Sequence, residues 1–357
     1  MSKPIAVLIS DVHYDINTLP LADAAMRLAI AKANELEVPL VIAGDLHDTK
    51  ANLRAECLLA MRATLSLCRI NCFIVRGNHD SINEKSTKTA LLSLETYEYG
   101  DRHDFHDDIT RSTEVISNPD FTNKIAVNGM SLYFIPYQHD PIDFKNVLDK
   151  IDKGSTIIMH QGVHGSISGE YIQDKSAVPK DWLADYRVIS GHYHTRQTIK
   201  TGRPRKGAVG SMDYIGNPYT LNYGEANDPE KGFQVLMSDG TLEFVPTNLR
   251  KHVVIQTSLD MGEVVAPCLG WNNDDLVKVK LSGTKEQLSK INKKEFGERL
   301  GVPESYKLEL IPLATQDDTK QKKAVQDTNL DTIIEELTNT TSEQKERLKT
   351  LWRNLCE

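Results

Sequence analysis

The sequence predicts a layered α/β domain, followed by a small α+β unit and a C-terminal pair of helices. Three observations support this prediction. Six short apolar runs rich in β-branched residues occur before residue 191, helix-forming segments follow the first two runs, and the pattern changes after about residue 245. Alternating strands and helices are typical of layered α/β domains.

The six runs have the length and composition of buried strands. They are residues 5–10, 40–43, 73–75, 132–136, 156–159 and 187–190. Segments 21–36 and 51–67 carry apolar residues at three- and four-residue spacing, which predicts two amphipathic helices. The polar region 83–128 gives no clear prediction.

The change of pattern divides the chain into four expected parts. Residues 1–245 form the main domain, and residues 246–313 form a small unit with strands at 276–281 and 306–311 around a helix at 285–300. Residues 314–329 are nearly devoid of large apolar side chains and predict a solvated linker. Residues 330–357 predict two short amphipathic helices, each with one apolar stripe.

Composition excludes several classes of protein. The 357 residues are 39% hydrophobic and 26% charged, as in folded globular proteins. The five cysteines form no CxxC pair, which argues against a disulfide framework or a thiolate zinc site. No apolar run is long enough to span a membrane and no signal peptide is evident, so we expect a cytoplasmic protein. The net charge of -8 gives no overall attraction to nucleic acid, so any DNA affinity must be local.

Side chains that bind metals follow most of the predicted strands. Loops at the carboxyl ends of strands in α/β sheets converge on one crevice, so these residues are expected to meet. Carboxylate, amide and imidazole ligands without thiolate suit manganese better than a structural zinc. The residues are Asp11, His13, Asp45, Asn78, His79, His160, His192 and His194.

Each of these short motifs is weak evidence alone, because polar residues commonly cap strand ends and form turns. Gly44-Asp45 can be a simple turn, and Gly77 to Asp80 can be a turn with a surface histidine. Five such motifs in order, each at the end of a predicted buried strand, favour one shared site instead.

The ordered set resembles the calcineurin-like metallophosphoesterase superfamily, whose pattern is D-x-H, G-D, G-N-H-D/E, H and G-H-x-H. The resemblance implies a layered β-sandwich flanked by helices and two divalent ions, manganese or alternatively magnesium. One ion would be held by Asp11, His13, Asp45 and His194, and the other by Asp45, Asn78, His160 and His192. It leaves His79 to protonate the leaving oxygen or neutralise the transition state, with Asp80 to orient it.

Three neighbouring residues stay ambiguous. His164 lies four residues after His160, and we favour a loop role for it. Some family members place a second catalytic histidine three residues after the bridging aspartate, where this chain has Asp48, with His47 one residue earlier.

The segment from Gly210 to Phe233 is similar to the corresponding segment of SbcD-like and phage recombination nucleases. This narrower resemblance implies a DNA exonuclease and endonuclease for recombination and repair. It also implies that residues 246–313 are a small α+β capping domain, and that the C-terminal helical pair docks on an SbcC-like ABC-type ATPase. A homodimer within a heterotetramer and a phage origin in a host cytoplasm are further implications.

Alternatives to this interpretation remain at this point, and one is a non-enzymatic scaffold for DNA ends. The chain can be a stand-alone phosphatase or nucleotide phosphodiesterase, and its terminal helices can fold back on the main domain. Four basic residues near the last motif are candidates for contacts with DNA phosphates, or else belong to a solvated turn around Gly202 and Pro204. They are Lys200, Arg203, Arg205 and Lys206.

Overall fold

The computed structural model describes most of the chain. The described residues are 2–50, 52–83, 85–99, 109–120, 123–168, 172–173, 177–202, 210–259, 271–272 and 274–313. The predicted linker and C-terminal helical pair therefore lie outside the described residues. Contacts divide the chain into two compact units, the first of residues 1–254 and 271–276 and the second of residues 255–270 and 277–357.

The first unit contains a seven-stranded sheet in the order β15-β14-β1-β2-β3-β5-β4. Strands β1, β2, β3 and β5 run parallel to one another, while β14, β15 and β4 pair antiparallel with their neighbours. The strands are β1 (Pro4–Ile9), β2 (Leu40–Ala43), β3 (Cys72–Val75), β4 (Thr96–Tyr99), β5 (Ile109–Ile116), β14 (Gly232–Met237) and β15 (Leu242–Pro246).

A second, six-stranded sheet in the same unit has the order β12-β13-β11-β8-β7-β6. Its central strands β7, β8, β11 and β13 are again parallel. The strands are β6 (Lys124–Val127), β7 (Met130–Ile135), β8 (Thr156–His160), β11 (Arg187–Gly191), β12 (Gln197–Lys200) and β13 (Ser211–Tyr214). A short pair, β9 (Ile167–Ser168) and β10 (Ile172–Gln173), lies apart from this sheet.

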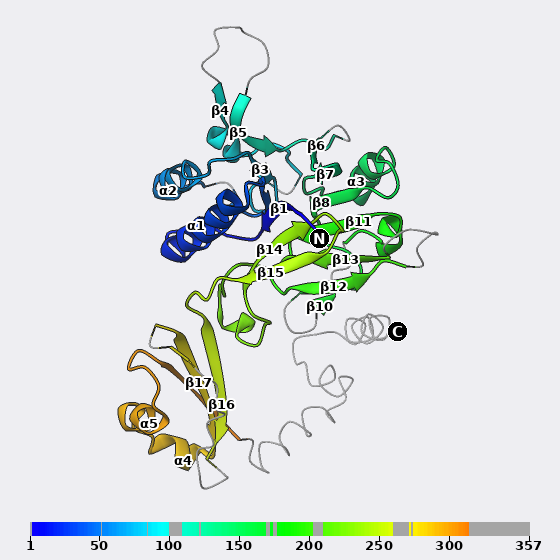
Figure 1. The fold of residues 1–357 in the computed structure, drawn as a ribbon. Helices are drawn as coiled ribbons and strands as arrows, with labels where there is room; N and C mark the ends of the chain where they lie inside the picture. Colours follow the sequence, from blue (N-terminus) through cyan, green and yellow to red (C-terminus); the bar gives the residue numbers. More distant parts are fainter. Residues whose placement is uncertain are drawn as a thin grey trace, which may run out of the picture. The chain divides into compact units, whose positions relative to one another are not determined.

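Helices cover the outer face of each large sheet, as Figure 1 shows. The helices α1 (Leu19–Leu36) and α2 (Ala55–Leu65) pack on the first sheet, and α3 (Pro141–Leu148) packs on the second. Three short 3-10 helices, η1 (Ala90–Leu94), η2 (Lys180–Leu183) and η3 (Tyr223–Glu225), complete the unit. Among the described residues, no helix combines the length and apolar character needed to cross a lipid bilayer.

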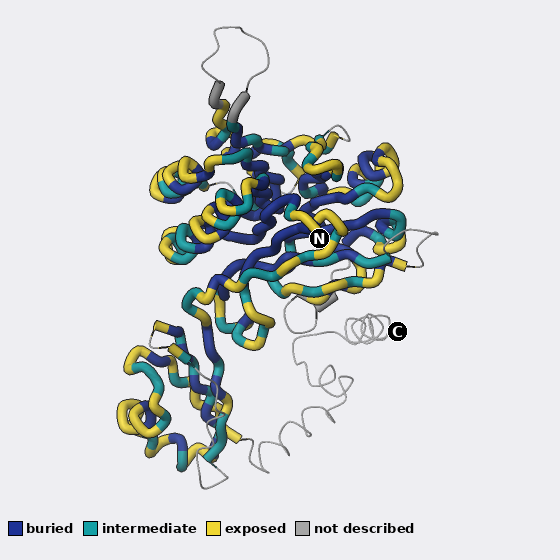
Figure 2. Tube along the Cα trace, viewed as in Figure 1, coloured by how far each residue is buried: buried dark blue, intermediate teal, exposed yellow. Residues whose placement is uncertain are grey.

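The two sheets share a buried apolar layer. Along β2, Leu40 and Ile42 face the helices while Val41 and Ala43 face the second sheet, as expected from the two-residue period of a strand. Phe73 of the first sheet stacks on Phe134 of the second with ring centroids 5.5 Å apart. Figure 2 shows this layer as buried strands crossing the unit. The prediction of a mixed α/β fold with layered sheets is confirmed.

The six predicted strands correspond to β1, β2, β3, β7, β8 and β11, and the two predicted helices to α1 and α2. The sequence patterns did not predict β4 to β6, β9, β10 or β12 to β16, although β5, β14 and β16 are as long as the predicted β1 or longer. Cys57, Cys68 and Cys72 are buried free thiols, as expected.

The second unit has a three-stranded sheet in the order β16-β17-β18. Its elements are β16 (His252–Ser258), β17 (Leu276–Gly283), α4 (Lys285–Ser289), α5 (Lys293–Leu300) and β18 (Lys307–Pro312). The prediction of one helix over 285–300 is wrong. Asn292 has extended backbone and its side chain accepts hydrogen bonds from the backbone N–H groups of Lys294 and Glu295, so it caps a new helix.

Candidate metal centre

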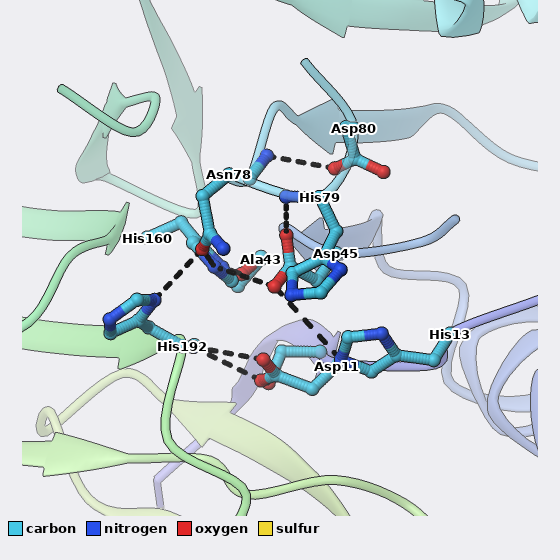
Figure 3. A network of polar contacts seen from close by, with 12 residues as sticks. Asp11, His13, Ala43, Asp45, Asn78, His79, Asp80, His160 and His192 are labelled. Carbon is cyan, nitrogen blue, oxygen red and sulfur yellow. Dashed lines mark hydrogen bonds and ion pairs between the residues drawn. The ribbon is translucent and has the colours of Figure 1, made fainter. Parts of the chain in front are cut away.

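The polar residues that follow the strands meet at one edge of the two sheets. Asp11 and His13 follow β1, Asp45 follows β2, and Asn78 follows β3 of the first sheet. His160 ends β8, and His192 and His194 follow β11 of the second sheet. Because these five strands are parallel within their sheets, their carboxyl ends deliver the side chains to a common place, which Figure 3 shows.

The backbone is strained where it delivers these side chains. Asp11, His13 and Asp45 have φ values of 52°, 50° and 48°, and His192 has a φ of 99°. Residues other than glycine seldom adopt a positive φ, and such conformations gather at functional sites. Four of the seven such residues in the described part of the chain belong to this cluster.

Two glycines permit the close approach of the strand-end side chains. A Cβ atom on Gly44 would lie 2.0 Å from His160 Nδ1, and one on Gly77 would lie 2.1 Å from Asp45 Oδ1. Neither neighbour can withdraw, because both side chains are buried. This explains in physical terms why glycine precedes Asp45 and Asn78 in the sequence motifs.

The Nε2 atoms of His13 and His194 face each other. The Nδ1 of His13 lies 2.9 Å from a carboxylate oxygen of Asp48, and that of His194 lies 2.8 Å from a carboxylate oxygen of Glu225. A carboxylate only accepts hydrogen bonds, so each Nδ1 carries a hydrogen and Nε2 is the atom of each ring that can bind a cation. The two Nε2 atoms lie 3.1 Å apart, so a proton or a metal cation can be shared between them. Asp11 contributes a third possible ligand atom within 4.8 Å.

His160 presents its Nε2 to two oxygen acceptors. Its Nδ1 donates to the carbonyl of Ala43 at 2.8 Å, and its Nε2 lies 3.2 Å from Asp45 Oδ2 and 3.1 Å from Asn78 Oδ1. Burial alone would lower the pKa of His160, but the Asp45 carboxylate raises it to about 9. A proton on Nε2 thus takes the position that a metal cation would take. The Nδ1 of His192 lies 2.9 Å from the same Asn78 oxygen.

Asp45 lies between the two groups of histidines. Its Oδ2 is 3.2 Å from His160 Nε2 and 4.0 Å from His13 Nε2, while its Oδ1 accepts the backbone N–H of His79 at 2.8 Å. Burial would raise the pKa of this carboxyl, yet His160 and His13 lower it. Asp45 therefore offers one charged oxygen to both groups, as a bridging ligand would.

His79 is oriented by Asp48. Its Nδ1 donates to the backbone carbonyl of Asp48 at 2.5 Å, and its ring meets the His13 ring edge-on with centroids 4.9 Å apart. Asp48 thus contacts His13 through its carboxylate and His79 through its backbone carbonyl. His79, His13 and Asp48 also form a group that could hold a metal ion.

Asp80 has different partners from those that the sequence suggested. Its carboxylate accepts the backbone N–H groups of His47 at 2.9 Å and Gly77 at 2.8 Å, so it joins two loops. Burial and the charge of Asp45 raise the pKa of Asp80 to about 6. The His79 ring nitrogen contacts the Asp48 carbonyl, while the Asp80 carboxylate is directed to these backbone groups. His164 is exposed, with its backbone N–H bonded to the Val178 carbonyl, which agrees with a loop role.

The sequence missed one carboxylate of the site. Glu225, in η3, is buried and contacts His194. Burial would raise its pKa, but the hydrogen bond from His194 and the charge of Lys231 lower it to about 2. Glu225 and Lys231 lie within the segment from Gly210 to Phe233, which the sequence analysis singled out without predicting a role for either residue.

Of the four predicted DNA-contact residues, the structure describes Lys200 alone, which is exposed at the end of β12. Arg203, Arg205 and Lys206 lie outside the described residues.

Comparisons with known proteins agree with this geometry. A family model described as calcineurin-like phosphoesterase matches residues 6–196, more than half of the 357 residues. The match includes all of the strand-end residues from Asp11 to His194, and Glu225 lies beyond it. A search of curated proteins found no match.

Proposed function

Because the chain belongs to the calcineurin-like phosphoesterase family, we propose that it is a two-metal DNA nuclease that works beside an ABC-type ATPase. The family and the Asp/His cluster together indicate a metal-dependent phosphoester hydrolase. The observation that carries the two-metal proposal is the position of Asp45 Oδ2, which lies near both His13 and His160.

We assign the ligands as the sequence motifs suggest. Asp11, His13, Asp45 and His194 would hold one ion, and Asp45, Asn78, His160 and His192 the other. The donor set has oxygen and imidazole nitrogen and no thiolate, which suits Mn²⁺, with Mg²⁺ as the alternative. When bound, such a pair of cations activates water and neutralises charge on the phosphoryl oxygens.

The chain's own residues contribute orientation and a proton. Hydrolysis forms a bond from a water oxygen to phosphorus and breaks the bond from phosphorus to the leaving oxygen, which then needs a proton. The attacking water releases one proton, which balances the one that the leaving oxygen takes up. His79 donates from Nδ1 to the Asp48 carbonyl, so its Nε2 is the atom that would give this proton, with the ring in its doubly protonated form. The contact between the Asp45 carboxylate and the His79 backbone N–H keeps this imidazole beside the bridging ligand.

DNA is proposed as substrate on the similarity of the segment from Gly210 to Phe233 to SbcD-like and phage recombination nucleases. Within this segment the side chains of Glu225 and Lys231 pack behind His194, so the similarity includes residues that contact the metal site. Lys200, Arg203, Arg205 and Lys206 are proposed to bind the phosphate backbone near the ions.

The proposed partner is an SbcC-like ATPase, held by the helical pair of residues 330–357, with residues 246–313 as a capping domain. Two short amphipathic helices after a polar segment bury their apolar stripes poorly by themselves, which supports a partner groove. A homodimer within a heterotetramer and a phage origin in a host cytoplasm complete the proposal.

The test is a Mn²⁺-dependent nuclease assay with and without the ATPase, on the native chain and on His79→Ala. We expect DNA cleavage that the ATPase stimulates with ATP, and a loss of about 10²- to 10⁴-fold in His79→Ala with Mn²⁺ binding retained. Deletion of residues 330–357 should abolish the stimulation only.

Hydrolysis of small phosphodiesters with no cleavage of DNA, even beside the ATPase, would contradict the nuclease. It would instead favour a stand-alone phosphatase or nucleotide phosphodiesterase.

A further inference from the structure

His194 rests on a buried carboxylate from a distant part of the chain. Its Nδ1 lies 2.8 Å from Glu225 Oε1, and the two residues are 31 positions apart. The Glu225 side chain is only 10% exposed, whereas Asp48, which holds His13 in the same manner, is 43% exposed. Water can therefore replace the Asp48 contact more readily than the Glu225 contact.

The second oxygen of Glu225 is held by groups that donate hydrogen bonds. Its Oε2 accepts from Asn217 Nδ2 at 2.9 Å and from the backbone N–H of Leu221 at 3.0 Å. The Lys231 ammonium lies 3.4 Å away. The two oxygens of the carboxylate therefore have different partners: Oε1 accepts from His194, and Oε2 accepts from Asn217 and Leu221 and lies near Lys231.

Lys231 connects the side chains around Glu225 to the backbone of His194. Its Nζ donates to the carbonyl of His194 at 3.0 Å, to Asp228 Oδ2 at 2.7 Å and to the side-chain oxygen of Asn217. The ring of His194 and its backbone are thus fixed by one set of side chains, which we call the Glu225 brace: Asn217, Glu225, Asp228 and Lys231.

We propose that Glu225 is a positioning residue that keeps His194 in the tautomer with Nε2 directed to the metal, and that the brace sets the affinity of the ion bound there. The inference rests on the metal ligands assigned in the proposed function, and it concerns binding of the ion independently of the substrate. A carboxylate behind a metal-binding imidazole fixes the ring and makes it more basic, and loss of such a partner typically weakens metal binding about 10- to 100-fold.

Glutamine at position 225 would keep the shape of the side chain but cannot accept hydrogen bonds at both of its terminal atoms. If its oxygen faces His194, its NH₂ group faces Asn217 Nδ2, the Leu221 N–H and Lys231, all of which are donors. If it is turned round, the NH₂ group meets the N–H of His194 and favours the wrong tautomer. Glu225→Gln is therefore a sharp probe of the brace.

The experiment measures Mn²⁺ binding by calorimetry and by electron paramagnetic resonance, on the full chain without DNA. Glu230→Gln is the matched control, because it removes the same charge from an exposed residue five positions away. We expect Glu225→Gln to weaken Mn²⁺ binding about 10- to 100-fold and Glu230→Gln to leave it unchanged. Thermal unfolding of the metal-free proteins shows whether both are folded.

Mn²⁺ affinity in Glu225→Gln within twofold of the native value, or an equal loss in both variants, would overturn the proposal. If Glu225→Gln does not fold, Asp228→Asn decides, since it removes the negative charge beside Lys231 and leaves the Glu225 side chain unchanged. A weaker Mn²⁺ affinity supports the brace, and an unchanged affinity overturns it.

These measurements separate the two proposals. Weakened Mn²⁺ binding in a protein that cleaves no DNA would contradict the nuclease and retain the brace. If Glu225→Gln binds Mn²⁺ as the native chain does and the native chain cleaves DNA, the nuclease is retained and the brace is contradicted.

Discussion

The histidines proposed for the two ions are held in different ways. His13 and His194 each donate to a carboxylate, whereas His160 donates to the backbone carbonyl of Ala43. A side-chain carboxylate can be altered while the fold stays intact, but a carbonyl within a buried strand cannot be moved without moving the strand. The site therefore has one part that tolerates adjustment and one part that is built into the sheet.

The largest effect on stability and Mn²⁺ binding should follow a change beside His160, whose Nδ1 donates to the Ala43 carbonyl. Gly44→Ala would place a Cβ 2.0 Å from His160 Nδ1, which either displaces the ring or moves the end of β2. Overpacking of this kind typically costs about 1 to 3 kcal/mol. We expect a lower unfolding temperature together with loss of Mn²⁺ binding, measured by thermal denaturation and calorimetry.

The control for this change is Gly129→Ala. Gly129 has a φ of 85°, close to the 90° of Gly44, but an added Cβ there meets no atom within 4 Å. Backbone strain is thus similar in both variants, and only Gly44→Ala should lose Mn²⁺. Equal behaviour of the two variants would mean that the contact of His160 with Ala43 does not hold the metal site.

An intermediate effect is expected at the exposed carboxylate. Asp48→Asn removes the negative charge beside His13 Nδ1 but keeps the carbonyl that orients His79. We expect Mn²⁺ affinity to fall about 10-fold, the low end of the range for such partners, because Asp48 is partly exposed. Titration with Mn²⁺ should restore most of the activity. Activity that stays as low as in His79→Ala at saturating Mn²⁺ would show that Asp48 acts on the reaction itself.

The smallest effect on the metals is expected from the proposed DNA contacts. Charge reversal at Arg203 and Arg205 should leave Mn²⁺ affinity unchanged and weaken DNA binding. The slope of log K against log salt concentration should fall by the equivalent of about two phosphate contacts. The measurement is the DNA dissociation constant across a range of salt concentrations. An unchanged slope would remove both residues from the footprint.

The sequence could predict the parts of the fold that depend on local patterns. The buried strands around Val41 and Ile158 are short apolar runs, and the polar residues after them lie at one edge because parallel strands require it. The helix boundary at Asn292 was missed, since the apolar spacing of residues 285–300 continues through a residue that caps a new helix.

The supporting contacts of the site could not be predicted, because they join distant segments. Glu225 meets His194 only through the path of the chain between them, and nothing in its local sequence names its partner. Asp80 is adjacent to His79 in sequence, which suggested a contact with its ring, but its carboxylate binds backbone N–H groups instead. Sequence neighbours are thus a poor guide to the hydrogen-bond partners of Asp80, and the contact between Glu225 and His194 joins residues 31 positions apart.

The most direct test of the two-metal account is a crystal of the chain grown with Mn²⁺ and measured at a wavelength where manganese scatters anomalously. We predict two peaks about 3.5 to 4 Å apart with Asp45 as a ligand to both. A single peak, or two peaks of which one does not contact Asp45, would contradict it.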